Sequence, residues 1–357
     1  MKIVDKRQAV KDSASLFLEN LDHDIYILGT NKYGIHTANW LKNKGYTIPG
    51  VINDFIDDAY YDGYKVVRLK DLNKNISIIN CIVEGRVIDA EKAITDFNPV
   101  SHTSYLSLQA AYPEELFQID FLQETDSIID KQDEYLELFD HLADEESKMT
   151  LENILNFRLN RDLHYLKDFR FRLSEQYFEP FIKLNASPVF IDGGAFDGET
   201  TSFFTGLYPG YDQVYLFEPN ERSMEVARKK LKQLSNINFF QTGLWDKTTT
   251  LHFDNSLGSA SKLTDDGSIA IDVVSIDEVV NAKVDFIKLD IEGAEFNALQ
   301  GAKRIIRRDK PTLAVCVYHA QDDFLRIPEL LKTYNPGYKI YLRHYTQGVF
   351  ETVMYFV

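Results

Sequence analysis

The first 113 residues alternate between stretches with helical spacing of apolar residues and short runs that are mostly apolar. Helical spacing extends over about 6–20, over the stretch that ends near Lys44, and over 86–97. The apolar runs lie at Asp24–Leu28, near 50–54 and at 76–83. Because strands that alternate with helices pair in parallel, residues 1–113 are predicted to form a smaller α/β domain.

The pattern becomes helical throughout between about 115 and 180. Apolar residues recur there at intervals of three and four, at Leu136, Phe139 and Leu142, and again at Leu155, Leu159, Leu163 and Leu166. This spacing is typical of helices with one buried face. Residues 114–185 are therefore predicted to form a helical connector of two or three helices.

The last 172 residues return to strand and helix alternation. Strands are predicted at 188–191, 213–217, 237–241, 284–289 and 312–318, with two late strands at 338–343 and 351–357. Helical spacing separates the earlier ones, and Met224, Ala227, Leu231 and Leu234 share one helix face. The pattern predicts a second, larger α/β domain over residues 186–357.

Composition narrows the class of protein. Apolar residues make up 44% and charged residues 26% of the 357 residues, which is ordinary for a globular chain. Cys81 and Cys316 lie in separate apolar runs, which favours reduced core residues in a cytoplasmic protein over a disulfide or zinc site. Neither a membrane-spanning run of about 18 residues nor a signal peptide is expected.

The net charge of −16 argues against a nucleic-acid partner, which requires a basic surface. Counted by segment, residues 114–149 hold 13 acids and 2 bases, whereas residues 186–357 hold 23 acids and 18 bases. Most of the acidic excess therefore lies in the connector. A solvated helix face explains it most simply, and a docking surface for a basic partner is the alternative.

The turn after the first apolar run is similar to a dinucleotide-binding fingerprint. Gly29 and Gly34 are present, but Asn31 replaces the middle glycine that lets the backbone approach a pyrophosphate. This replacement weakens the case for a nicotinamide cofactor and favours a Rossmann-like domain without one. Binding of a nucleotide or nucleotide-sugar stays open, with Asp54 as the residue that would contact its ribose.

A second glycine-rich turn follows the strand at 188–191. The predicted binding residues in this turn are Asp192, Gly193, Gly194, Ala195, Phe196, Gly198 and Thr200. Glycines allow close backbone approach to a ligand. The acid that opens the turn would repel a pyrophosphate and suits a cationic ligand, which points to S-adenosylmethionine with its ammonium and sulfonium groups.

Two further strand ends complete the predicted cofactor site. Glu218 follows the strand at 213–217, where an acid can accept hydrogen bonds from both ribose hydroxyls. Pro219 then ends the strand, and Asn220 can cap the next helix. The later residues Gly243, Leu244 and Trp245, followed by Asp246, are expected to form an apolar slot beside a carboxylate for an adenine ring.

Catalytic candidates follow the last two strands of the parallel series. Asp290 and Glu292 follow the strand at 284–289, and His319 follows the strand at 312–318. Ligands of such sheets bind beyond the carboxyl ends of the strands, so these residues are expected on one edge with Asp192 and Glu218.

The motifs DGGAFDGET, LFEPN, TGLWD and IKLDIEGAEFNALQGA resemble the FkbM family of methyltransferases, as do LRHY and ETVMYF near the end. LADEESK and EQYF are similar to the segment that precedes the domain in longer bacterial members. The resemblance covers about 140–357, and the K-x-D-x-E-G-x-E run is its most specific part. One departure is the first turn, where Gly193 and Phe196 replace residues of the common DVGAN.

This resemblance implies a class I, Rossmann-like methyltransferase fold whose mixed sheet ends in an antiparallel strand. It also implies O-methylation, often of sugars or secondary metabolites, with S-adenosylmethionine as the methyl donor. We therefore expect an enzyme of glycan biosynthesis that methylates a sugar hydroxyl in a surface polysaccharide or its nucleotide-linked precursor. The alternatives are a nicotinamide-dependent sugar oxidoreductase and a non-catalytic ligand-binding scaffold.

Methyl transfer from a sulfonium is an in-line displacement that needs an aligned hydroxyl and a proton acceptor. His319 is the expected general base, because its ordinary pKa suits proton abstraction near neutral pH. Asp290 would orient that base, contact the acceptor or hold the donor. Glu292 is the third catalytic candidate, while Glu295 near the helix start has a structural explanation in the helix dipole.

No metal is expected, although Asp290, Glu292 and His319 could hold a divalent ion. Ser256, Ser259 and Ser261 are expected in a loop that either covers the substrate or simply connects two elements. The expected partner is a small molecule or a glycan, and a homo-oligomer is compatible with the sequence. The identity of the acceptor does not follow from the sequence.

Overall fold

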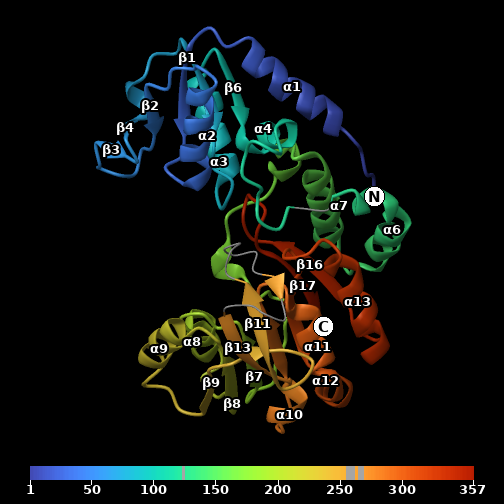
Figure 1. Ribbon diagram of the computed structural model, residues 1–357. Helices are drawn as coiled ribbons and strands as arrows, with labels where there is room; N and C mark the ends of the chain where they lie inside the picture. The colour runs from blue at the N-terminus through green and yellow to red at the C-terminus, as the bar shows by residue number, and fades with distance from the viewer. Residues whose placement is uncertain (123–124, 255–261, 264–268) are drawn as a thin grey trace. The chain divides into compact units, whose positions relative to one another are not determined.

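The computed structural model describes residues 1–122, 125–254, 262–263 and 269–357. The chain divides into two compact units (Figure 1). The N-terminal unit comprises 1–133, 149–173 and 344–350, and the C-terminal unit comprises 134–148, 174–343 and 351–357. The three serines proposed for a covering loop, Ser256, Ser259 and Ser261, lie outside the described residues.

The N-terminal unit contains a six-stranded sheet in the order β3-β4-β2-β1-β5-β6. Its strands are β1 (Asp24–Leu28), β2 (Gly50–Ile52), β3 (Tyr60–Tyr61), β4 (Tyr64–Val67), β5 (Ile76–Asn80) and β6 (Ser101–Ser104). All of its described pairings are parallel except the one between β3 and β4. The Rossmann-like prediction for this part of the chain agrees with this sheet.

Three helices of this unit lie where the periodicity predicted them: α1 (Arg7–Glu19) before β1, α2 (Lys32–Asn43) between β1 and β2, and α3 (Val87–Phe97) between β5 and β6. Two further helices, α4 (Tyr105–Ala111) and α5 (Ser127–Asp130), follow β6. The core between sheet and helices includes Ile52, Ile76, Ile78 and Ile94, all at most 1% exposed. Every residue of β5 is buried, as expected for a parallel strand with both faces covered.

The C-terminal unit contains a seven-stranded sheet in the order β16-β17-β15-β14-β7-β8-β9. Its strands are β7 (Val189–Gly193), β8 (Gln213–Phe217), β9 (Ile237–Phe240), β14 (Phe286–Leu289), β15 (Thr312–Cys316), β16 (Ile340–His344) and β17 (Thr352–Phe356). The inner pairs are parallel, and β17 pairs antiparallel with β15. The expected mixed sheet with an antiparallel last strand is confirmed.

Helices cover both faces of this sheet. Figure 1 shows α8 (Glu199–Leu207) and α9 (Glu221–Lys230) on one side, and α11 (Glu295–Gln300), α12 (Lys303–Asp309) and α13 (Asp323–Tyr334) on the other. The short helix α10 is Ile276–Val279. Between sheet and helices, the ring of Phe190 stacks on Phe204 and Phe286 at centroid distances of 4.4 and 5.1 Å. Burial of such aromatic side chains is a main source of stability.

The sequence pattern missed a second, smaller sheet. It has the order β10-β13-β11-β12, with β10 (Gly243–Leu244), β11 (Thr249–Asp254), β12 (Lys262–Leu263) and β13 (Ile269–Val274). This sheet places the end of β10 against β13 and so positions Leu244 and Trp245.

The expected connector is distributed over the two units. Its main helices are α6 (Gln132–His141) and α7 (Glu145–Asn160), followed by two short 3-10 helices, η2 (Leu163–Leu166) and η3 (Leu173–Glu175). Residues 134–148 belong to the C-terminal unit, where the buried Arg343 pairs with Asp144 at 2.6 Å. The division at 1–113, 114–185 and 186–357 thus stays a prediction.

Two further observations concern the whole chain. Cys81 and Cys316 are both buried and unpaired by disulfides. Among the described residues, no helix combines the length and the apolar character that crossing a membrane requires.

Candidate active site

The glycine turn, residues 193–198, joins β7 to α8 and crosses the end of β14. Gly194 and Gly198 have φ of 74° and 80°, in the left-handed region that favours glycine. A Cβ on Gly194 would lie 1.8 Å from the carbonyl oxygen of Asp290. The sequence analysis attributed these glycines to the close approach of a ligand. At Gly194, however, the end of β14 by itself leaves no room for a side chain.

Phe196 is the exposed residue of this turn. Its φ of 48° is unusual for a bulky side chain, and the residue is 68% exposed. Its backbone N–H donates to Oε2 of Glu218 at 2.9 Å. The turn is therefore fastened to the end of β8, while Ala195 is buried and Thr200 lies partly buried on the first turn of α8.

Asp192 is fully buried and has partners within the protein. Its Oδ2 accepts a hydrogen bond from Thr201 at 2.7 Å, and its Oδ1 lies 3.3 Å from Nζ of Lys288. The expectation that this acid faces a cationic ligand did not take Lys288 into account. The protein itself supplies the cation that Asp192 contacts.

Lys288 connects Asp192 to the glycine turn. Its Nζ donates to the carbonyl oxygens of Gly193 and Gly194 at 3.1 and 2.7 Å. Burial opposes the charge of this ammonium, but the carboxylates of Asp192 and Asp290 outweigh it and raise the pKa of Lys288. Lys288 is thus a buried cation that organises the turn.

Glu218 lies at the end of β8 with each carboxylate oxygen held by one backbone N–H. Oε2 accepts from Phe196 at 2.9 Å and Oε1 accepts from Asn220 at 2.8 Å. Burial raises the pKa of this carboxyl. Asn220 caps α9 as predicted, with its side chain accepting from Ser223, and Pro219 is exposed beside it.

The predicted adenine slot lies next to the glycine turn. Leu244 is buried, and a Cβ on Gly193 would lie 2.8 Å from its Cδ1. Trp245 is partly buried and its backbone N–H donates to Val274 at 3.0 Å, while Gly243 pairs with Val273 in the smaller sheet.

Asp290 follows β14 directly and is held by two tyrosines. Tyr177 donates to Oδ2 at 2.9 Å, and Tyr318 donates to Oδ1 at 3.3 Å. Burial favours the neutral acid, but Lys288, His319 and the tyrosine hydroxyl lower the pKa of this carboxyl overall. Its side chain is still 24% exposed, so one edge can reach a ligand.

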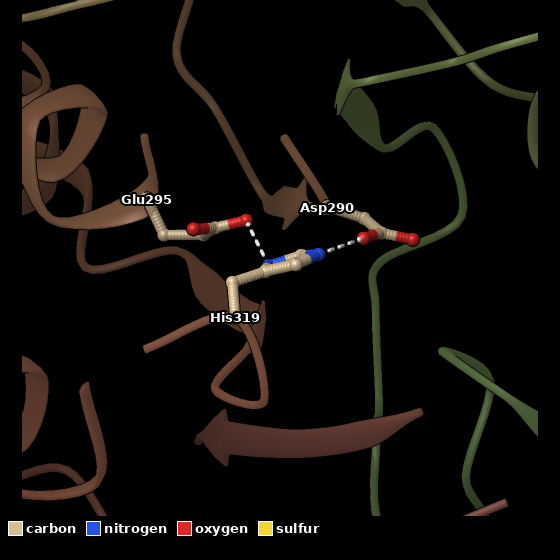
Figure 2. A group of neighbouring side chains, drawn as sticks. All are labelled: Asp290, Glu295 and His319. Carbon is tan, nitrogen blue, oxygen red and sulfur yellow. Dashed lines mark ion pairs between the residues drawn. The ribbon is translucent and has the colours of Figure 1, made fainter. Parts of the chain in front are cut away.

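His319 lies between carboxylates, and its side chain is fully buried. Nδ1 is 2.9 Å from Oε1 of Glu295, and Nε2 is 3.7 Å from Oδ1 of Asp290, on the opposite side of the ring (Figure 2). Nε2 also lies 3.6 Å from Oε2 of the largely exposed Glu292. Burial opposes the imidazolium, but Glu295, Asp290 and Glu292 prevail and raise the pKa of His319 to about 9.

Asp290, Glu295 and His319 form the one group among the described residues whose ligand atoms are close enough to be considered for a metal. Figure 2 shows that the two carboxylates face different nitrogens of the ring. Since a metal ion binds one nitrogen of a histidine, these three side chains do not converge on one point. The arrangement fits an imidazolium between two carboxylates.

The structure thus brings the predicted residues of four strand ends to one edge of the sheet. The sequence analysis assigned no role to Lys288 and Tyr177, although Lys288 opens the K-x-D-x-E-G-x-E run and Tyr177 lies in EQYF. It also missed Glu351, whose Oε2 accepts from Gln176 at 2.5 Å. Burial and the Asp290 charge raise the pKa of Glu351 to about 7, and no spacing rule marked it.

In the candidate nucleotide site of the N-terminal unit, Asn31 and Asp54 bind backbone groups of the protein. Asn31 caps α2 by accepting from Gly34 at 2.9 Å and donates across to the carbonyl of Cys81, after β5, at 3.0 Å. Asp54, the expected ribose ligand, accepts from the backbone N–H of Leu69 at 3.0 Å. Both side chains therefore already have backbone partners within this unit.

The comparison with known proteins covers the residues of this site. The model of the family described as the methyltransferase FkbM domain matches residues 192–340, which include the glycine turn, Glu218, Asp290 and His319. No curated protein matches the chain.

One solved structure shows the same fold over nearly the whole chain, and others are more distant. The crystal structure of methyltransferase FkbM from Methylobacillus flagellatus KT has 23% sequence identity and a TM-score of 0.75, with 98% of each chain covered. Fibrillarin from Aeropyrum pernix, solved with S-adenosyl-L-methionine, is 14% identical over 52% of this chain and 74% of its own, with a TM-score of 0.35. An rRNA methylase from Streptococcus thermophilus is 15% identical over 48% and 87%, with a TM-score of 0.33.

The first of these structures covers both units, so the fold of the whole chain recurs in it. The other two are too distant to support an argument. The match to the family model identifies an FkbM methyltransferase domain at residues 192–340, and the chain is therefore a methyltransferase.

Proposed function

We propose that this protein uses S-adenosylmethionine to methylate a sugar hydroxyl, in a surface polysaccharide or in its nucleotide-linked precursor. The observation that carries the proposal is the position of Glu218 beside the glycine turn, at the sheet edge that also holds Asp290 and His319. The proposed reaction takes place in the cytoplasm, where Cys81 and Cys316 stay reduced.

The residues of this edge fit that cofactor in two ways. Each oxygen of Glu218 accepts one backbone N–H and keeps capacity for a hydroxyl donor, as a ribose requires. Lys288 contacts Asp192 and the glycine turn. The exposed edges of Asp290 and Glu292 therefore give this part of the site a negative electrostatic potential. That potential favours a ligand with ammonium and sulfonium groups.

In this proposal, the residues after each strand contact a different part of the cofactor. The glycine turn and Asn220 would lie along the methionine and ribose parts, and Gly243, Leu244 and Trp245 along the adenine. When bound, S-adenosylmethionine supplies an activated methyl group.

His319 would accept the proton of the acceptor hydroxyl at Nε2. Because its carboxylate neighbours keep it protonated near neutral pH, the neutral form that acts as base grows as the pH approaches 9. Asp290 would orient the acceptor and Glu292 would contact it from the exposed side.

A nicotinamide-dependent oxidoreductase has less support. Its pyrophosphate would lie at the turn after β1, where Asn31 replaces the middle glycine of the fingerprint and its side chain donates to the carbonyl of Cys81 at 3.0 Å.

Binding of S-adenosylhomocysteine, measured by calorimetry, tests the proposed cofactor. Glu218→Ala removes the ribose acceptor and should weaken this binding by about 1.5–3 kcal/mol, roughly 10- to 100-fold. Glu221→Ala, an exposed acid on the first turn of α9, serves as the control and should bind like the wild type. Unchanged affinity in Glu218→Ala, or tight binding of NAD with none of S-adenosylhomocysteine, would contradict the proposal.

A further inference from the structure

The Asp290 carboxylate is held on both oxygens by phenol hydroxyls. Tyr177 reaches Oδ2 from the segment before β7, and Tyr318 reaches Oδ1 from the segment after β15. Tyr177 precedes the residues that match the FkbM domain, so the preceding segment contributes a side chain to the site.

Tyr177 is itself fixed by contacts on several sides. Its φ is 68°, its backbone N–H donates to the hydroxyl of Tyr355 at 3.1 Å, and its ring lies 5.3 Å from Nζ of Lys288. Its hydroxyl is also 3.5 Å from Sγ of Cys316, and the residue is 6% exposed. The hydroxyl therefore has little freedom to follow a moving carboxylate.

The two carboxylates that flank His319 lie at different distances. Glu295 is at hydrogen-bond distance from Nδ1, 2.9 Å, whereas Asp290 remains 3.7 Å from Nε2. The second distance is too long for a hydrogen bond. Opposite charges without another restraint would close that gap, so the tyrosines act against closure.

We propose that Tyr177 and Tyr318 are positioning residues whose hydroxyls hold the Asp290 carboxylate away from His319. The proposal deepens the function given above and rests on it for its catalytic meaning: the proton on Nε2 stays outside hydrogen-bond distance of Asp290, and the exposed edge of that carboxylate can contact an acceptor hydroxyl. Closure of the Asp290–His319 pair would bind the proton more tightly.

Several charged groups surround His319, and a test of the tyrosines must leave these charges unchanged. Glu295 faces it from α11, Asp290 from the end of β14 and Glu292 from the following turn. Asp323 on α13 and Glu351 beside β17 also interact with it. Exchange of Tyr for Phe alters none of these charges.

Titration of His319 by NMR in the full chain tests the proposal directly. Histidine is labelled with nitrogen-15, and the His319 signal is identified by its loss in His319→Gln. In Tyr177→Phe the freed carboxylate moves onto Nε2, so the titration midpoint should rise by about one pH unit. Tyr318→Phe should move it in the same direction by less, since that contact is 3.3 Å.

Tyr338→Phe is the matched control, because Tyr338 donates to the carbonyl of Pro311 at 2.7 Å and not to Asp290. Its midpoint should equal that of the wild type. An unchanged or lower midpoint in a folded Tyr177→Phe protein would overturn the proposal. If Tyr177→Phe does not fold, the same comparison applies to Tyr318→Phe.

Methyl transfer provides a second readout. Tyr177→Phe should lower kcat at neutral pH about tenfold with the KM for S-adenosylmethionine unchanged, which a general loss of structure would not do. A shifted midpoint in a protein that binds no S-adenosylhomocysteine would support the positioning role while refuting the proposed function. The two claims therefore fail separately.

Discussion

His319 is the residue whose chemistry depends most on its surroundings. The sequence identified it from its place after a strand and from the ordinary pKa of histidine. The structure raises that pKa to about 9, because Glu295, Asp290 and Glu292 outweigh the cost of burial. A base expected to be half neutral near pH 6.5 is thus protonated there.

This shift predicts a pH dependence of stability. The folded pKa lies above the unfolded value of about 6.5, so the His319 contribution is full below pH 6.5 and is lost as the pH rises through about 9. The free energies of unfolding of the wild type and of His319→Gln, both measured in urea, should therefore approach each other as the pH rises from 7 to 10. The expected convergence is on the order of 3 kcal/mol. A constant difference across that range would show that His319 is neutral in the folded chain.

At the residue scale, Glu218, Asp290 and His319 were selected because each follows a predicted strand. The structure places Glu218 and Asp290 directly after β8 and β14, and His319 three residues after β15. Their roles in binding and catalysis stay predictions. Lys288 was missed because a lysine within a buried strand has no spacing signal, and its role depends on Asp192 from another strand. Tyr177 was missed because its partner Asp290 is 113 positions away in sequence.

Among the elements, the glycine turn is the most constrained. Gly194 combines a positive φ with an approach of 1.8 Å between a hypothetical Cβ and the carbonyl of Asp290. Gly194→Ala should destabilise the protein by about 3 kcal/mol or more and abolish S-adenosylhomocysteine binding, because both the turn and the end of β14 must shift.

Gly206→Ala is the matched control on the neighbouring helix. A Cβ on Gly206 meets nothing within 4 Å, and alanine favours the helix by roughly 0.5–1 kcal/mol. Thermal unfolding should show a lower Tm for Gly194→Ala and an equal or higher Tm for Gly206→Ala. Equal Tm values for Gly194→Ala and wild type would contradict the packing described for this turn.

Elements with strong periodicity were predicted well, and those that depend on partners were not. β8 has the predicted bounds, Gln213–Phe217. The buried face of α6 differs from the predicted one, because Tyr135 and Leu138 are buried whereas Leu136 is 42% exposed. The smaller sheet was missed because its strands depend on pairing with one another. β11 pairs with β13, and the remaining partners are the two-residue strands β10 and β12.

At the scale of the whole molecule, the acidic stretch at 114–149 is used in part for internal pairing. Glu115 pairs with Lys44 at 2.7 Å and Asp120 with Lys32 at 3.1 Å within the N-terminal unit. In the C-terminal unit, Asp144 pairs with Arg343. The acidic stretch therefore coincides with a region where the chain passes from one unit to the other. A count of charges could not show which of these acids form ion pairs within the units.

Transfer of the methyl group is the measurement that tests the central claim most directly. The protein is incubated with S-adenosylmethionine carrying a tritiated methyl group and with a panel of nucleotide-sugars and polysaccharides, and the label in each acceptor is counted. The account predicts label on a sugar oxygen, and a much lower turnover in His319→Ala with donor affinity retained. Binding of the donor without transfer to any sugar hydroxyl, or full activity in His319→Ala, would contradict it.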